Sequence, residues 1–326
     1  MRICRFRSNE TVQFGFYSEE RIVPFTGAFA AYSAAGDSAA TGKGGIDLPS
    51  HTEKLEFLPP SGSACEDTRR VADWLSDHIE RLSPEQLLAV NDVELLVPLP
   101  RPNKLFLLAG NYAKHIEEGG GIAEERADTF PYVFMKPPST TLTDPGEPIR
   151  IPSVSPNYID WELELAVIIG RTARHVSESE ALDYVAGYTI INDISDRQFR
   201  PNPNRKERPR DKFFDWLHGK WHDSFCPCGP CVTTPDAIPD PQQLDLKLRV
   251  SGELKQDAST SQQIFPVAAV IEFISNITTL EPGDIISTGT PQGVGRSSDT
   301  YLAAGHKIQA SISGIGTLVT MVADEE

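Results

Sequence analysis

The chain has 326 residues, 39% of them hydrophobic and 23% charged, so it can bury a large core and is not wholly disordered. Its formal net charge of −16 argues against a nucleic-acid partner, because phosphate binding requires a basic surface and the dense basic segment 205–210 is short. No apolar run reaches the roughly 20 residues of a membrane-spanning helix, and the N-terminus does not resemble a signal peptide. We therefore expect a cytoplasmic protein with no nucleic-acid or membrane partner.

The first third of the chain predicts a small α+β unit. Residues 1–27 alternate apolar and polar side chains, which favours a β-meander, and 28–50 are rich in Ala, Gly and Ser, as in a loop with a short helix. Apolar residues at helical spacing predict a helix over 67–82. A connector punctuated by prolines follows, so we place a small N-terminal domain over 1–97 and a catalytic domain over 98–326.

An acidic stretch over 160–170 is the most informative part of the sequence. It alternates acidic and apolar residues and then becomes purely apolar, which predicts a strand entering a core with Glu162 and Glu164 on one face. Neighbouring carboxylates repel each other, and a divalent cation that prefers oxygen ligands, Mg²⁺ or Mn²⁺, relieves the repulsion. A solvated acidic face is the alternative. Asp193, near the end of the apolar strand expected over 187–195, offers a third carboxylate.

A histidine and a glutamate follow the apolar strand expected over 104–110. His115 and Glu118 are three residues apart in a segment that predicts a short helix, so their side chains meet on one face. Such a pair orients the imidazole and makes it more basic, as a general base requires, although an exposed ion pair is the alternative. The glycine run 119–121 beside it has the flexibility that a movable lid needs.

Cysteines and histidines form a second candidate metal site. Cys226, Cys228 and Cys231 follow His218 and His222, but the cysteines are spaced too tightly and are too rich in proline for a typical zinc site. Buried, reduced thiols are the alternative, and the odd number of five cysteines in the chain does not suggest a disulfide framework.

A glycine-rich segment over 289–295 is a third candidate site. It lacks the spacing of a dinucleotide-binding loop and the lysine of a P-loop. We expect a tight loop that offers backbone N–H groups and the Thr290 hydroxyl to an anion such as a carboxylate.

Taken in order over 104–320, these motifs resemble the fumarylacetoacetate hydrolase family. The matching segments are a lid segment, a strand ending in lysine, the acidic strand, an Asn-Asp pair, a lysine before a Phe-Cys-Pro run, and a glycine loop: Gly110–Glu118, Phe134–Pro137, Asp160–Gly170, Asn192–Asp193, Lys220–Pro230 and Thr288–Gly295. The chain departs from the family where Asp196 and Gln198 stand in place of the usual Ala and Asp, and where a charged insertion occupies 200–218.

The resemblance implies a mostly β fold with α/β elements, in which a β-roll catalytic domain carries a small N-terminal α+β domain. It implies Mg²⁺ or Mn²⁺ held by Glu162, Glu164 and Asp193, a small anionic 2-oxo acid as substrate, and a homodimer. Asp160 is then a flanking residue. The implied catalytic residues are His115, Glu118 and Lys220, and the implied substrate-binding residues are Asn111, Tyr112, Lys136, Arg197 and Thr290.

The reaction is harder to choose, because an enolate is common to C–C hydrolysis, decarboxylation and tautomerisation of 2-oxo acids. We expect metal-dependent cleavage of a C–C bond through a metal-stabilised enolate, with acylpyruvate-type hydrolysis ahead of oxaloacetate-type decarboxylation. One alternative is an isomerase or dehydratase of unsaturated or sugar-derived 2-oxo acids. Another is a catalytically silent ligand-binding protein that keeps the fold.

Overall fold

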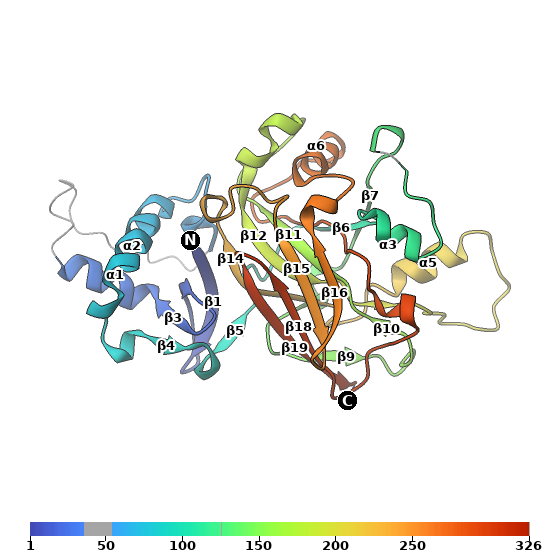
Figure 1. The fold of residues 1–326 in the computed structure, drawn as a ribbon, viewed down its shortest axis with the longest axis horizontal. Coiled ribbons are helices and arrows are strands. Elements are labelled where there is room, and N and C mark those ends of the chain that lie inside the picture. Colours follow the sequence, from blue (N-terminus) through green and yellow to red (C-terminus); the bar gives the residue numbers. More distant parts are fainter. Residues whose placement is uncertain (36–53, 125, 326) are drawn as a thin grey trace.

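The computed structural model describes residues 1–35, 54–124 and 126–325, and one large sheet runs through most of its length (Figure 1). Among these residues, 12 strands join this sheet. Its main path runs through β4 (Leu88–Ala89), β3 (Arg21–Pro24), β2 (Thr11–Tyr17), β1 (Arg2–Ser8), β14 (Cys226–Thr233), β12 (Val185–Asn192), β11 (Leu163–Ile169), β17 (Ile285–Ser287), β6 (Leu105–Ala109) and β7 (Tyr132–Met135). Off this path, β5 (Glu94–Leu96) pairs with β1 and β8 (Leu142–Thr143) pairs with β14.

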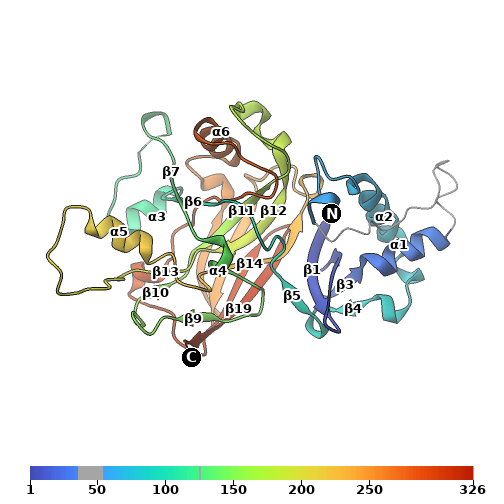
Figure 2. The ribbon, with the colours of Figure 1, turned by 180° about the vertical axis from the view of Figure 1, so that it is seen from behind.

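A second sheet packs against the first and closes the β-rich body. Its 5 strands among the described residues are β16 (Glu253–Ser259), β15 (Asp245–Val250), β18 (Lys307–Ile312), β19 (Gly316–Asp324) and β9 (Ile149–Ile151). A short pair of strands, β10 (Ile159–Asp160) and β13 (Ser195–Asp196), lies beside the central strands. The helices are α1 (Phe25–Ala34), α2 (Cys65–His78), α3 (Ala113–Glu118), α4 (Pro138–Thr141), α5 (Asp211–His218) and α6 (Val267–Ile277), seen from behind in Figure 2.

The N-terminal strands form the predicted meander and also extend the central sheet. β1 pairs with β14 through Arg2 opposite Thr233 and Ile3 opposite Val232. Of the loop and helix predicted over 28–50, the structure describes a helix that ends at Ala34, and the part from 36 onward lies outside the described residues. Because the two predicted domains share a sheet, the boundary after residue 97 stays a prediction.

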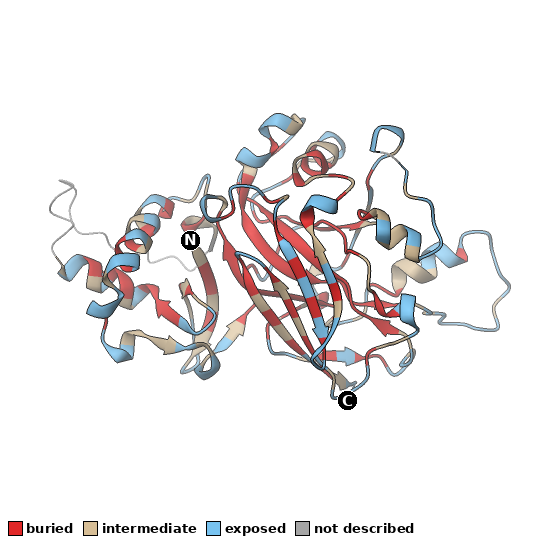
Figure 3. Cartoon of the chain, in the orientation of Figure 1, coloured by how far each residue is buried: buried red, intermediate tan, exposed pale blue. Residues whose placement is uncertain are grey.

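Every residue of β11 and β12 is buried, as expected for apolar runs in the middle of a sheet (Figure 3). Alternate side chains of β11 enter two different core clusters: Leu163 and Leu165 on one face, Ala166 and Ile168 on the other. The alternation predicted from the sequence is therefore present, and it turns Glu164 toward the second face.

The acidic stretch is not one continuous strand, which corrects the sequence prediction. β10 ends at Asp160 and β11 begins at Leu163. Hydrogen bonds to side chains replace the sheet ladder in between: the Trp161 N–H donates to Asp160 Oδ1 (2.8 Å) and the Glu162 N–H donates to Asn192 Oδ1 (2.9 Å). The resulting bend places the Glu162 carboxylate beside Asp193.

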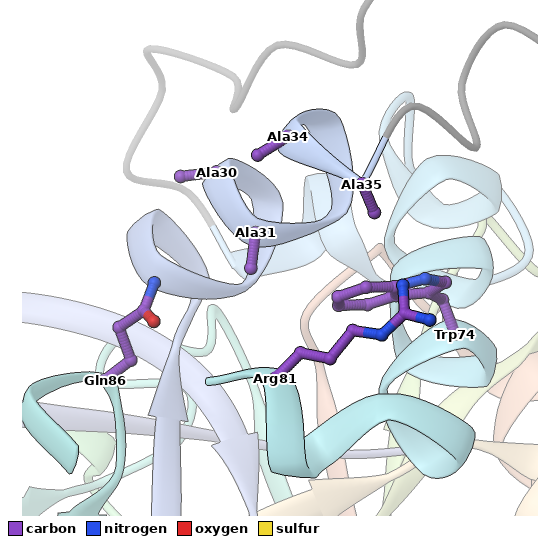
Figure 4. Close-up of a pocket in the computed structure, with 7 residues that line it drawn as sticks. All are labelled: Ala30, Ala31, Ala34, Ala35, Trp74, Arg81 and Gln86. Carbon is purple, nitrogen blue, oxygen red and sulfur yellow. The ribbon is translucent and has the colours of Figure 1, made fainter. Parts of the chain in front are cut away.

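The helices lie at the ends and edges of the sheets. A hollow of about 490 Å³ between α1, α2 and the Arg81–Gln86 segment is lined by small alanine side chains and Trp74 (Figure 4). It lies at the end of the molecule opposite α3 and α5 (Figure 1). In the described part of the chain, no helix is long and apolar enough to cross a membrane.

Candidate metal centre

Three buried carboxylates converge at the central strands. One oxygen from each of Glu162, Glu164 and Asp193 lies within 4.8 Å of the others, an arrangement that could hold a metal ion. Antiparallel pairing of Leu163 with Asn192 sets the ends of β11 and β12 side by side, and the Asp193 N–H donates to the Glu162 carbonyl (2.8 Å). Backbone hydrogen bonds thus fix two of the three carboxylate-bearing residues to each other.

Three cationic side chains neutralise two of these carboxylates. Lys220 Nζ lies 2.7 Å from Glu162 Oε2 and 2.5 Å from Asp193 Oδ2. Lys136 Nζ contacts Asp193 Oδ1 (2.5 Å), and Arg197 Nη2 contacts Glu162 Oε1 (2.6 Å). Burial alone would raise the pKa of Glu162, but the charges of Lys220 and Arg197 outweigh it and hold the pKa below its usual range. Glu162 is therefore ionised.

Glu164 differs from the other two. Its Oε2 accepts hydrogen bonds from Ser287 Oγ (2.6 Å) and the Gly289 N–H (2.8 Å), whereas its buried Oε1 has no hydrogen-bond partner among the described residues. Burial, together with the negative charges of Asp193 and Glu162, raises the pKa of Glu164 well above its usual range. A divalent cation bound to Oε1 would compensate both the unpartnered oxygen and the charge, so these residues fit a metal.

Asp160 is a flanking residue whose carboxylate is fully occupied. Its Oδ1 accepts the N–H groups of Trp161 and Gly295, and its Oδ2 accepts the Arg296 N–H (3.0 Å) and Arg197 Nε (2.7 Å). It therefore anchors the guanidinium of Arg197, whose other end contacts Glu162. With Asp160 included, four buried carboxylates face only three cations, and Glu164 is the one that contacts none of them.

The glycine-rich loop binds carboxylates, as its composition predicted, but the carboxylates belong to the protein. The N–H groups of Gly289, Gly293 and Gly295 donate to Glu164, Glu118 and Asp160 respectively. Gly289 has φ +88°, and a Cβ there would lie 2.8 Å from Asn111 Cβ, so glycine is required where the loop passes α3. The loop thus ties together the acidic strand and the helix that carries His115.

His115 and Glu118 form the predicted pair. His115 Nδ1 lies 2.9 Å from Glu118 Oε1, and Glu118 Oε2 accepts the Gly293 N–H (3.0 Å). Burial alone would raise the pKa of Glu118, but the hydrogen bonds from His115 and Gly293 outweigh it and lower the pKa. An ionised Glu118 only accepts hydrogen bonds, so the proton of a neutral His115 sits on Nδ1 and Nε2 is left as the base. When His115 is protonated, its charge also helps to hold the pKa of Glu162 down, so the pair lies near the acidic triad.

The structure places the predicted substrate-binding residues in two groups. Lys136 and Arg197 reach the triad directly, and Lys136 Nζ also donates to the carbonyls of Ile194 and Phe225. The remaining residues are buried in the frame around it. The Asn111 amide donates to the carbonyls of Phe265 and Thr288, and the Thr290 hydroxyl donates to the Leu163 carbonyl. Tyr112 is buried, and this burial, with the charge of Glu164 nearby, raises its pKa.

Two aromatic residues around Lys220 were not predicted as part of the site. The Lys220 ammonium lies 5.3 Å from the centre of the Phe134 ring and 5.8 Å from that of Trp216, distances typical of cation–π contacts. The two rings contact each other at 5.0 Å. They form a wall on the outer side of the ammonium. Trp216 lies on α5, inside the charged insertion over 200–218, and only its helical spacing before Lys220 could have indicated its position.

Comparison with known proteins identifies the family. A model of the C-terminal domain of fumarylacetoacetate (FAA) hydrolase matches residues 104–323. The chain belongs to the fumarylacetoacetate hydrolase family. A second family model, described as Rv2993c-like, N-terminal, matches residues 1–45. The predicted family and fold class are confirmed.

Relatives within the fumarylacetoacetate hydrolase family are named as enzymes of several kinds. An oxaloacetate tautomerase of Xenopus laevis, named as mitochondrial, is 35% identical over 281 residues, which are 84% of this chain and 81% of that protein. A maleylpyruvate hydrolase from Sphingobium sp. SYK-6, solved with manganese(II) and pyruvate, is 27% identical with a TM-score of 0.69 and full coverage of both chains. A 5-carboxymethyl-2-hydroxymuconate delta-isomerase from Mycobacterium smegmatis is 27% identical with a TM-score of 0.67, also with full coverage. The chain is thus a family enzyme for small 2-oxo acids, and a cytoplasmic location stays a prediction.

The cysteine-rich segment forms a buried strand, not a zinc site. All five cysteines are buried and none forms a disulfide. In the described residues, the acidic triad is the one group of three or more His, Cys, Asp or Glu residues that could hold a metal. Cys226, Cys228 and Cys231 lie on β14, where burial raises the pKa of the Cys226 thiol well above its usual range. The alternative of buried, reduced thiols fits these residues.

Proposed function

We propose that this protein is a divalent-metal-dependent enzyme that interconverts the keto and enol forms of a small 2-oxo acid of the oxaloacetate type. The observation that carries the proposal is the unpartnered, buried Oε1 of Glu164 in an acidic triad beside the His115–Glu118 pair. The named activity of the Xenopus laevis relative supports this choice of reaction. Tautomerisation also demands the least of the site, because it needs an enolate and a proton donor and acceptor but no attacking water.

Glu162, Glu164 and Asp193 would hold Mg²⁺ or Mn²⁺. When bound, the metal would supply Lewis-acid stabilisation of the negative charge that develops on the keto oxygen. Lys136, Lys220 and Arg197 surround the triad and attract the substrate carboxylates, although the whole chain carries a net charge of −16. Their positive charge favours anionic over neutral substrates, so the site selects acids.

His115 moves the proton. With Nδ1–H held by Glu118, Nε2 accepts a proton from the carbon next to the keto group and delivers it to the enolate oxygen to give the enol. The reverse transfer, from the enol oxygen to the carbon, gives the keto form. Glu118 stays ionised and stabilises the imidazolium that forms in between. The Gly293 N–H fixes Glu118 to the glycine-rich loop, so the base keeps a constant orientation toward the triad.

Hydrolysis of a C–C bond in an acylpyruvate is the second candidate. The manganese and pyruvate in the maleylpyruvate hydrolase neighbour favour it, because pyruvate is the fragment that such a cleavage would release. In this reaction His115 would take a proton from water instead of from carbon. Decarboxylation of oxaloacetate would need His115 neither to accept a proton from carbon nor to activate a water molecule.

The experiment that tests the proposal compares three reactions of the purified full chain with Mn²⁺ or Mg²⁺. Enol oxaloacetate is followed by its ultraviolet absorbance, acetylpyruvate by loss of the diketo chromophore, and pyruvate release by a coupled dehydrogenase. We expect faster conversion of enol to keto oxaloacetate, abolished by a chelator. His115→Ala should lower this rate about 10²–10⁴-fold.

Lys114→Ala is the matched control, because it removes a long exposed side chain one position away on the same helix. It should leave the rate unchanged. Cleavage of acetylpyruvate without any tautomerase activity would replace the first candidate by the second. Activity that survives both the chelator and His115→Ala would reject the metal-dependent mechanism altogether.

A further inference from the structure

An acid and an imidazole face each other beside the metal centre, and the reaction described above uses neither of them. Asp196 lies at the end of β13 with a fully buried side chain (0% exposed), and the side chain of His222 is 16% exposed. Asp196 Oδ2 and His222 Nε2 lie 3.7 Å apart, and in the described part of the chain neither atom has a hydrogen-bond partner. Because unpaired polar atoms are costly to bury, their position opposite each other needs a physical reason.

The two groups are suited to each other more than to their other neighbours. Asp196 Oδ1 already accepts the Gln198 N–H (3.1 Å), which leaves Oδ2 for an imidazole with a proton on Nε2. Hydrogen bonds from Ser153 (both 2.8 Å) lower the pKa of Glu325, and the charge of a protonated His222 adds to this, so Glu325 is near but already has its partner. Asp196 also stands where the family resemblance gives Ala, so the pair is a feature of this chain.

The Asp196–His222 pair encloses the segment that carries Lys220. The Asp196 N–H donates to the Gly219 carbonyl (2.9 Å) just before Lys220, and the Asp196 side chain faces His222, two residues after Lys220. β13 and this segment approach each other closely, because a Cβ at Gly219 would lie 2.5 Å from the Asp196 carbonyl oxygen. Figure 2 shows β13 beside β10, next to α5, which leads into this segment. Asp196 therefore contacts the chain on both sides of the lysine.

The same pair is connected to the other two cations of the site. Arg197 follows Asp196 directly in the chain. The ring of His222 packs against that of Phe225 at 4.9 Å, and the Phe225 carbonyl accepts a hydrogen bond from Lys136 Nζ (2.5 Å). All three cations contact carboxylates of the acidic triad. Their positions thus depend on backbone segments that the pair joins together.

We propose that Asp196 and His222 are positioning residues, whose contact holds Lys220 and Arg197 in the places where these cations bind the carboxylates of an acidic substrate. The proposal rests on the proposed function, which assigns substrate binding to these cations. Long cationic side chains lose conformational entropy when they bind a ligand, so cations that are fixed beforehand bind it more tightly. Without the pair, the Lys220 segment would keep its backbone hydrogen bond to β13 on one side and lose the contact on the other.

The first test asks whether the two side chains interact, by urea unfolding of the full chain. Asp196→Ala removes the carboxylate, and His222→Phe keeps an aromatic ring against Phe225 and removes the ring nitrogens. Each change alone should lower the urea midpoint, because it leaves the other group buried without a partner. The double variant should lose less than the sum of the two losses, since no unpaired group remains. Additive losses would overturn the proposal.

The second test measures the position of Lys220 without metal or substrate. Lys220 is 2% exposed, so it should react slowly with acetic anhydride, and mass spectrometry compares its labelling with that of the exposed Lys247. Asp196→Ala and His222→Phe should each raise the labelling of Lys220 severalfold. His222→Gln presents an amide N–H to Asp196 and should keep the labelling low. If His222→Gln behaves like His222→Phe, a hydrogen bond to Asp196 is not what holds the lysine.

Two control variants separate positioning from a general loss of stability. Asp223→Asn removes the charge of an exposed acid next to His222 and should leave the labelling of Lys220 unchanged. Val71→Ala opens a cavity under α2, at the opposite end of the molecule from α5 (Figure 1), and should lower the urea midpoint without raising the labelling. Equal labelling in Val71→Ala and Asp196→Ala would show a general loosening and reject the positioning role.

The third test measures binding of oxalate, a small diacid, to the Mn²⁺-loaded chain by titration calorimetry. Asp196→Ala should raise the dissociation constant of oxalate about tenfold, because one cationic side chain must then be ordered on binding. His222→Gln should keep the wild-type value, and an unchanged constant in Asp196→Ala would reject the positioning role. A wild type without tautomerase activity, in which Asp196→Ala still changes labelling and oxalate affinity as expected, would reject the proposed reaction and keep the role of the pair.

Discussion

At the scale of single residues, Glu164 is the group most affected by its surroundings. In the metal-free protein its pKa is raised, so at any pH between the ordinary and the raised pKa the folded state holds a proton that the unfolded chain has released. The cost to stability is absent below the ordinary glutamate value of 4.5 and grows as the pH rises toward the folded-state pKa. We predict that Glu164→Gln increases the free energy of unfolding of the chelator-treated protein near neutral pH, measured by urea titration.

The same change should weaken binding of Mn²⁺, because a neutral amide is a poorer ligand for a hard cation than a carboxylate. Calorimetric titration checks this. Wild-type affinity should rise with pH, since the metal must displace the proton from Glu164. Ser287→Ala serves as a comparison, because it removes one hydrogen bond to Glu164 and leaves its charge. A variant Glu164→Gln that is less stable without metal, or that binds Mn²⁺ as tightly as the wild type, contradicts the assignment.

The sequence indicated some of these residues and not others, for a physical reason. Glu162 and Glu164 stood out because strand alternation is a local pattern. The role of Asp160 depends on the N–H groups of Gly295 and Arg296, which lie 135 and 136 positions further along the chain. Contacts across such separations leave no local pattern. The unpartnered oxygen of Glu164 is likewise a property of packing, so the sequence predicted three acids but not their different charge states.

At the scale of elements, the Glu118 carboxylate attaches helix α3 to the glycine-rich loop. Glu118 accepts hydrogen bonds from His115 on its own helix and from Gly293 on the glycine-rich loop. We predict that Glu118→Gln lowers the catalytic rate at least about tenfold, because a neutral amide neither fixes the His115 tautomer nor stabilises the imidazolium. Faster hydrogen exchange at the Gly293 amide should accompany the loss.

Glu117→Gln provides the matched control on the same helix. Glu117 is exposed, and the change removes the same charge one position away. It should alter neither the rate nor the exchange at Gly293. If both variants lose activity equally, the net charge of the helix matters and not the Glu118 contact. If Glu118→Gln keeps full activity, His115 needs no orienting partner.

Elements with a strong local pattern were predictable, and those defined by their neighbours were not. The apolar runs that form β6 and β12 were predicted close to their observed bounds. β16 reads Glu-Leu-Lys-Gln-Asp-Ala-Ser and has no strand pattern of its own, yet it pairs with β15 along its length. Likewise, the charged insertion over 200–218 contains α5, because the Trp216 ring of that helix packs against Phe134 on β7.

At the scale of the whole molecule, the N-terminal part and the metal centre share one core. The cluster that contains Ile3 and Val23 from the N-terminal strands also contains Ala166 and Ile168 of β11, which lie on the same face of the strand as Glu164. Tight packing transmits small displacements between such neighbours. The N-terminal strands therefore support the strand that carries the candidate metal ligands, whatever other role the first 97 residues have.

This shared core leads to a prediction about cooperativity. Ile3 is fully buried, and its strand pairs with β2 on one side and β14 on the other. Ile3→Ala should cost about 2–5 kcal/mol and shift the unfolding of the entire protein, because the cavity lies in the common core. Scanning calorimetry should show one transition at a lower temperature, together with weaker Mn²⁺ binding on warming. Val12→Ala, at an exposed position of β2, should change stability by less than about 0.5 kcal/mol. Two separate transitions, with only one of them moved by Ile3→Ala, would instead show that residues 1–97 fold independently of the metal centre.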